Sequence, residues 1–129
     1  MKLYRWLIWV AFLGFWTYLL LFPVPEELVQ TTEHYIGRRY IVAKTVHVTC
    51  YTILAILSGW LRIPTRFRPF LMFFIMAHGT ITEHLQLFTS HRDGNLFDVG
   101  FDNCGILFGT LIAWRWWTAP DQASGSDPH

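Results

Sequence analysis

The sequence predicts an all-α polytopic membrane protein, a bundle of four transmembrane helices. Hydrophobic residues make up 53% of the 129 residues and charged residues only 15%, whereas soluble domains carry about 25% charged residues. Four stretches each offer the roughly 20 apolar residues that a helix needs to cross a hydrocarbon core of about 30 Å. We expect one transmembrane domain over residues 1–118 and a disordered tail over 119–129, since the tail is polar and contains Pro and Gly.

The first predicted span covers residues 3–22, with Arg5 as its only charge, and it ends at Pro23. Proline cannot continue a helix interior. A signal peptide is the alternative interpretation. The apolar run is longer than the usual hydrophobic region of a signal peptide and lacks a small-x-small cleavage site, so we expect a membrane span.

The other predicted spans cover residues 43–63, 69–88 and 96–117. The second is followed by Pro64, and the third begins at Pro69, which suits a first helical turn. The fourth closes on a tryptophan cluster of the kind found at membrane interfaces. Each of these three spans is polar at one end only.

Basic residues in the short loops predict the orientation. With the N-terminus inside, six Lys and Arg residues fall on the cytoplasmic side and four on the outer side. We therefore expect a multi-pass protein of the inner (plasma) membrane with both termini in the cytoplasm. The polar ends of the last three spans then lie in the outer half of the bilayer.

Helical spacing places the polar residues on one face of each of these spans. The set is Lys44, His47 and Tyr51 in the second span, Glu83 and Gln86 in the third, and Asp98 and Asp102 in the fourth. A carboxylate at the centre of a span costs about 2.5 to 3.5 kcal/mol on insertion scales. These residues therefore require partners or a wet cavity.

Two interpretations of this set stay open. In the first, Lys44 and Arg92 pair with two of the three acids and the network is purely structural. In the second, the residues line a functional polar pocket, the usual role of ionisable groups inside a membrane. A net charge of +1 gives no surplus for binding nucleic acid.

Metal and other cofactors are not expected. His78, Glu83 and His84 lack the spacing that puts two ligands on one helical face. Cys50 and Cys104 are interpreted as small apolar thiols rather than as a disulfide. The G-x-x-x-G of Gly105 and Gly109 predicts close helix packing.

The ordered polar set resembles the VanZ-like family. The resemblance runs over about residues 43–112, through K-x-x-H-x-x-x-Y from Lys44, H-G-x-x-x-E-x-x-Q from His78 and R-x-x-x-x-x-D from Arg92, followed by Asp102, Gly105 and Gly109. It implies a small multi-span protein, and the founding type of the family is associated with resistance to the glycopeptide teicoplanin. Two positions depart from the pattern. Ala43 stands where an Asp is common, and Asp102, which is followed by Asn103, stands where an Asn is expected.

The sequence supports two functions for this set. One is a pocket that binds an anionic lipid headgroup or another amphiphile and so alters envelope properties or glycopeptide sensitivity. Its ligand-binding residues would be Lys44, Tyr51, Gln86, Arg92 and Asp102. The alternative is an intramembrane enzyme that modifies a phospholipid or polyprenyl phosphate, with His47, Glu83 and Asp98 as general acids or bases. Whether the protein is an enzyme, and whether it forms oligomers, stays open.

Overall fold

The computed structural model of the chain describes residues 3–22, 36–88 and 96–121, with side chains from residue 41 onward in the second range. These ranges are helical, with turns and short connections and no strand, which confirms the all-α class. The helices are α1 (Leu3–Leu21), α3 (Ile36–Trp60), α4 (Arg68–Gln86), α5 (Leu96–Ile112) and the short α6 (Trp114–Thr118). A 3₁₀ turn, η2 (Thr65–Phe67), leads into α4.

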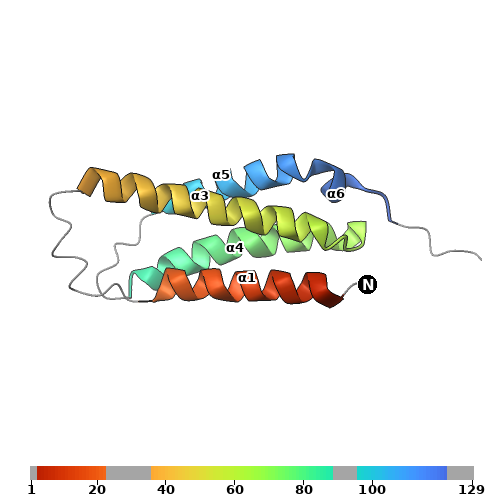
Figure 1. Cartoon of the computed structure of the whole chain (residues 1–129), viewed down its shortest axis with the longest axis horizontal. Helices are drawn as coiled ribbons and strands as arrows, with labels where there is room; N and C mark the ends of the chain where they lie inside the picture. The colour runs from red at the N-terminus through yellow and green to blue at the C-terminus, as the bar shows by residue number, and fades with distance from the viewer. Residues whose placement is uncertain (1–2, 23–35, 89–95, 122–129) are drawn as a thin grey trace, which may run out of the picture.

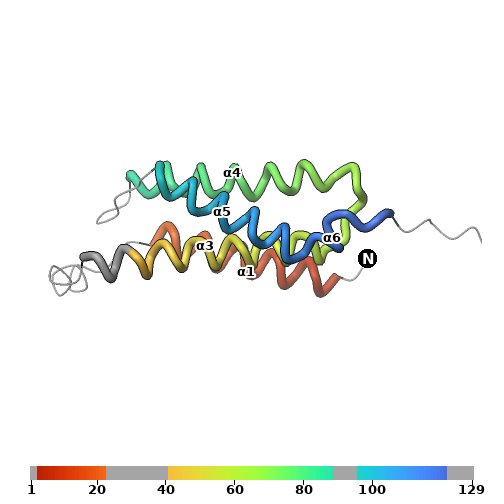
Figure 2. The backbone as a smooth tube through the Cα atoms, turned by 90° about the horizontal axis from the view of Figure 1, so that it is seen from above, coloured from red at the N-terminus to blue at the C-terminus, as the bar shows by residue number. Residues whose placement is uncertain are grey.

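The four long helices run side by side along the long axis of the molecule (Figure 1). The start of α1, the connection from α3 to α4, and α6 lie at one end of the bundle, which we call the N-terminal end. Turned by 90°, α5 is seen between α4 and α3 (Figure 2). The pair formed by α3 and α5 is the most extensive helix contact among the described residues.

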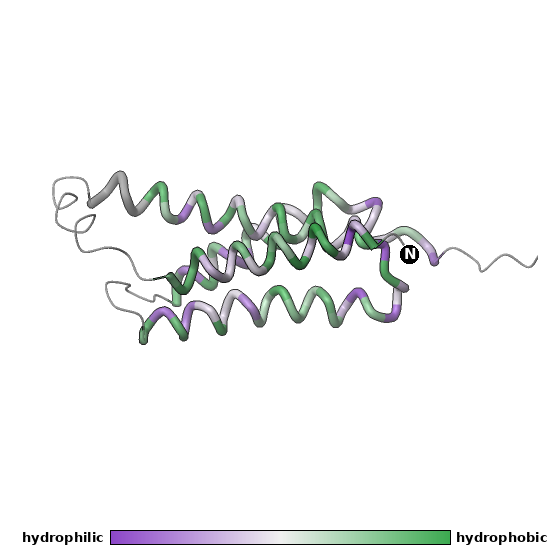
Figure 3. Tube along the Cα trace, turned by 60° about the horizontal axis from the view of Figure 1, so that its bottom comes forward, coloured by the Kyte–Doolittle hydropathy of each residue, from purple (hydrophilic) through white to green (hydrophobic). Residues whose placement is uncertain are grey.

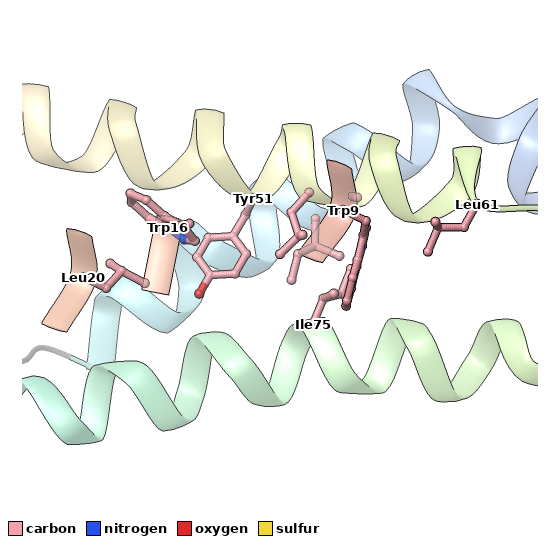
Figure 4. Packing of buried hydrophobic residues seen from close by; sticks show 9 residues of the cluster. Trp9, Trp16, Leu20, Tyr51, Leu61 and Ile75 are labelled. Atoms are coloured by element: carbon pink, nitrogen blue, oxygen red, sulfur yellow. The ribbon is translucent and has the colours of Figure 1, made fainter. Parts of the chain in front are cut away.

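An apolar core runs along the bundle axis (Figure 4). Its buried members come from every long helix: Trp9, Trp16, Leu20, Tyr51, Leu54, Ala55, Leu61, Ile75 and Ile106. The aromatic side chains of this core also make polar and ring contacts. The Trp9 indole donates to Ser58 Oγ at 2.8 Å, and the Tyr51 ring meets Trp16 edge to face.

Glycines allow α3 and α5 to approach backbone to backbone. A Cβ added at Gly105 would lie 2.5 Å from the Val48 carbonyl oxygen, and one at Gly109 would clash with the Thr52 carbonyl. Thr52 Oγ1, which donates to the Val48 carbonyl oxygen at 2.7 Å, also lies 3.1 Å from the Gly105 carbonyl oxygen across the interface. The packing role predicted for the G-x-x-x-G is confirmed.

The predicted fourth span is not one continuous helix. α5 ends at Ile112, and Ala113 leaves the helical conformation with φ −93° and ψ 18° before α6 begins. The turn places the buried Trp117 against α3, where its indole donates to the Ala55 carbonyl oxygen at 3.1 Å. Gly59 makes room for this ring, since a Cβ there would lie 2.7 Å from the indole nitrogen.

The outer surface of the bundle is unusually apolar. Phe73 of α4 is 72% exposed and Phe108 of α5 is 63% exposed, while the acidic side chains of the same helices are buried. Hydrophobic residues fill much of the middle of the helices, and hydrophilic residues recur toward the ends (Figure 3). Two of the described helical segments, Leu3–Leu21 and Ile41–Trp60, are long and apolar enough to cross a membrane.

Candidate functional site

The polar residues singled out in the sequence gather inside the half of the bundle away from the N-terminal end. Lys44 of α3 forms an ion pair with Asp98, which stands in the first turn of α5. Glu83 and Asp102 lie close enough to Lys44 to act on its charge. A single ammonium group therefore faces carboxylates from both α4 and α5.

His47 lies one turn further along α3 and pairs with Asp102. Its Nδ1 is 2.8 Å from Asp102 Oδ1, and both side chains are at least nine-tenths buried. The Trp16 ring of α1 packs edge to face on the imidazole, with ring centroids 5.4 Å apart. Such a carboxylate can fix the orientation and tautomer of an imidazole, as an acid or base requires.

A second chain of polar contacts joins α3 to α4 and α1. The Tyr51 hydroxyl is 3.0 Å from His78 Nδ1, and the opposite ring nitrogen, Nε2, is 2.8 Å from Thr17 Oγ1. Thr17 also donates its hydroxyl to the Leu13 carbonyl oxygen at 2.7 Å. This chain begins at Tyr51, one turn after His47 on α3, and ends at Thr17 of α1.

Glu83 and Gln86 of α4 are also buried. Glu83 is only 2% exposed, and Gln86 Nε2 donates to the Leu20 carbonyl oxygen at 3.1 Å. Leu20 belongs to the last turn of α1, so this bond ties the end of α4 to the end of α1. A carbonyl near a helix end lacks an intrahelical donor, which makes it a suitable acceptor.

One surface groove reaches this polar region. It has a volume of about 380 Å³ and lies between the first described turns of α3 and the start of α5. Its walls are mostly apolar and are formed by Ile41, Lys44, Thr45, Val48, Thr49 and Phe101. The Lys44 ammonium lies 5.9 Å from the centre of the Phe101 ring. The groove thus combines a long apolar wall with one cationic group.

The structure separates the predicted site residues into two groups. Lys44 alone lines the groove, whereas Tyr51, Gln86 and Asp102 are buried in the interior with His47, Glu83 and Asp98. Arg92 lies outside the described residues. Within the described part of the chain, no group of three metal-ligating side chains comes together.

Sequence reasoning did not assign a role to Thr17, the partner of His78. Nothing in the spacing of α1 could identify it, because a lone threonine in an apolar span is common and usually donates to the carbonyl four residues earlier.

A different cluster closes the N-terminal end. The buried Arg68 guanidinium donates to the carbonyl oxygens of Ile63 and Trp117, at 3.1 and 2.7 Å. Asp121 accepts from the Thr65 amide at 2.7 Å and from the Thr65 hydroxyl at 2.8 Å, and these bonds lower the pKa of its carboxyl group. The chain after α6 is therefore fastened to the turn that precedes α4.

Comparison with models of known protein families, with curated proteins and with solved structures finds no match.

Proposed function

We propose that the protein is a VanZ-like integral membrane protein that binds an amphiphile with an anionic headgroup. α1, α3, α4 and α5 would be its four spans, and the amphiphile would occupy the groove between α3 and α5. Binding would alter envelope properties such as sensitivity to glycopeptides.

The exposed faces of α4 and α5 support four spans. The mean hydropathy of these helices is reduced by buried polar residues, yet the residues on their outer faces, such as Phe73 and Phe108, are large and apolar. A soluble monomer rarely exposes apolar patches larger than a few hundred Å². Polar groups inside and aromatic groups outside are what a lipid environment favours.

The observation that carries the binding proposal is the presence of Lys44 in an otherwise apolar groove. Acyl chains fit the wall formed by Ile41, Val48 and Phe101, and a phosphate or carboxylate headgroup would share the ammonium of Lys44 with its partner Asp98. The two parts of an amphiphile therefore meet matching surfaces within about two turns of α3.

A groove-blocking variant tests this proposal without touching the ion pair. Thr49→Phe fills the groove from its wall, while Val46→Phe adds the same ring to a part of α3 that does not line it. Native mass spectrometry of the purified protein, loaded with phosphatidylglycerol or phosphatidylcholine, measures retained lipid. We expect phosphatidylglycerol to be retained by the wild type and by Val46→Phe and lost from Thr49→Phe. Equal retention by all three proteins would refute the groove as the site.

The intramembrane enzyme is the second candidate, and the His47–Asp102 pair favours it. Both residues are buried behind the groove, so a substrate would have to reach them from Lys44. Lipid analysis of cells with and without the protein distinguishes the two functions. A headgroup that changes in amount, and that stops changing in His47→Gln, supports catalysis, whereas an unchanged lipid composition supports binding alone.

A further inference from the structure

The described residues at the polar end of the groove carry more negative than positive charge. The Lys44 ammonium binds Asp98 Oδ1, and the two side chains are 14% and 8% exposed. The charges of Glu83 and Asp102 also act on Lys44. A phosphate that binds this ammonium therefore enters next to carboxylates, and their repulsion weakens the attraction that the ammonium alone would provide.

An ammonium group can hold two acceptors at once. It has three N–H donors in a tetrahedral arrangement, so a phosphate oxygen and Asp98 Oδ1 can both bind Lys44. With each acceptor at the usual distance from the nitrogen, the two acceptor oxygens lie about 4.7 Å apart. This separation is too long for a direct hydrogen bond between headgroup phosphate and carboxylic acid. A hydroxyl on the second carbon of a headgroup alcohol can span it.

Two side chains at this end of the groove can accept hydrogens from such an alcohol. An ionised carboxylate has only acceptor oxygens, and the described partner of Asp98 is the donor Lys44. Thr45 lines the groove and donates its single hydroxyl hydrogen to the Ile41 carbonyl oxygen at 2.8 Å. Its oxygen keeps lone pairs that can accept another hydrogen. The groove thus offers an ammonium for a phosphate and acceptors for hydroxyl groups.

We propose that the groove selects anionic phospholipids whose headgroup alcohol carries free hydroxyl groups, as glycerol and sugars do. The phosphate binds the Lys44 ammonium, one hydroxyl donates to the Asp98 carboxylate, and a second donates to Thr45 Oγ1. A simple alkyl phosphodiester has the same charge but brings no donor to compensate Asp98 for the shared ammonium. This inference rests on the proposed function, because it names the headgroup class that the groove takes.

Two lipids of equal charge test the proposal on the unchanged protein. Phosphatidylglycerol and phosphatidylpropanol with the same acyl chains share the phosphodiester and differ only by the hydroxyls of the head alcohol. An equimolar mixture is added to the purified full chain in detergent micelles, and native mass spectrometry measures each bound lipid. We expect phosphatidylglycerol to be retained about tenfold more, the effect of one hydrogen bond to a charged group.

The outcomes separate this proposal from the binding function on which it rests. Equal retention of the two lipids by the wild type, with both lost from Thr49→Phe, would keep the groove as a lipid site and overturn the hydroxyl specificity. Retention of neither lipid would overturn the binding function and the specificity together.

A matched pair of threonine variants tests the second acceptor. Thr45→Val keeps the shape of the side chain and removes its oxygen, so the ratio of bound phosphatidylglycerol to phosphatidylpropanol should fall about threefold, as for a neutral hydrogen bond. Thr110→Val is the control. Thr110 also donates to the carbonyl oxygen four residues earlier, at 2.8 Å, but does not line the groove. Its variant should keep the wild-type ratio.

Asp98→Asn tests the first acceptor. The amide oxygen still accepts a hydrogen but has lost its charge, so the ratio of the two bound lipids should fall here as well. Both lipids compete for the same folded molecules, so this ratio does not depend on how much of the variant folds. A wild-type ratio in both Asp98→Asn and Thr45→Val would overturn the proposal.

Discussion

Asp98 is a charged residue in the mostly apolar helix α5, and it forms an ion pair with Lys44 of α3. Its side chain is 8% exposed and that of Lys44 is 14% exposed. Removing one member of such a pair leaves the other charge buried, and this is more costly than removing both. The ion pair therefore stabilises the α3–α5 interface only while both charges are present.

We predict that Asp98→Asn destabilises the protein by about 3 kcal/mol, the lower end of the range for breaking a buried pair. The lower end applies because Glu83 and Asp102 also lie near Lys44. Thermal unfolding in detergent micelles measures the loss. The double variant Lys44→Met with Asp98→Leu removes both charges and should recover most of it. If Asp98→Asn melts like the wild type, the pair contributes nothing to stability.

Asp121 gives a pH-dependent contact outside the four long helices. Its pKa lies below the ordinary value of 3.8 because it accepts two hydrogen bonds from Thr65. A carboxyl group whose folded pKa is depressed stabilises the fold above its unfolded pKa and loses this contribution as pH falls through the folded value.

The Thr65 amide should therefore show an NMR shift that titrates only below about pH 4, the ordinary range of an aspartate. In Asp121→Asn the amide side chain keeps an acceptor oxygen but no longer titrates, so the transition should disappear. A Thr65 amide that titrates identically in both proteins would assign the change to another group.

At the scale of elements, the contact between α3 and α5 depends on two glycines in α5. A methyl group at Gly105 or Gly109 would press on carbonyl oxygens of α3. Backbone atoms cannot rotate away as a flexible side chain can, so the helices must separate. Gly100 lies on the same helix, and a Cβ there meets nothing within 4 Å.

We predict that Gly105→Ala and Gly109→Ala each lower stability by about 1 to 3 kcal/mol, the usual cost of overpacking. Gly100→Ala should be neutral or stabilising, since alanine favours a helix over glycine by about 1 kcal/mol. Thermal unfolding of the three variants in one detergent compares them. Equal melting temperatures would show that α3 and α5 do not meet backbone to backbone.

Helical periodicity predicted these elements to different degrees. Helix α1, predicted as the first span, ends at Leu21, one residue before the predicted boundary, because an uninterrupted apolar run and a following proline define it. The break at Ala113 was not predicted, because it accompanies the packing of the Trp117 indole against Gly59 of α3, a contact between residues far apart in the sequence. Spacing likewise placed Lys44 and Asp98 on polar faces. It could not show which faces meet, since that depends on the rotation of each helix in the bundle.

At the scale of the whole molecule, charge is distributed unequally between the two ends. Arg5 at the N-terminal end donates to the Trp60 carbonyl oxygen at 3.0 Å, and the exposed Arg62 and Arg66 lie in the connection before α4. The buried acids Glu83, Asp98 and Asp102 lie toward the opposite end. Basic residues in short loops favour the cytoplasmic side of a membrane.

We therefore predict that the N-terminal end of the bundle is cytoplasmic and that the groove opens in the outer leaflet. Single cysteines introduced at Ser90 and Ser124, in a background of Cys50→Ala and Cys104→Ser, report the two sides by labelling intact cells. Neither serine is among the described residues, so both probes test the topology without disturbing a described contact. A membrane-impermeant maleimide should label position 90 in intact cells, and position 124 only after the cells are permeabilised. The opposite pattern would show that the orientation is the reverse of the predicted one. The Lys44 groove would then open in the cytoplasmic leaflet and would take phosphatidylglycerol from that leaflet.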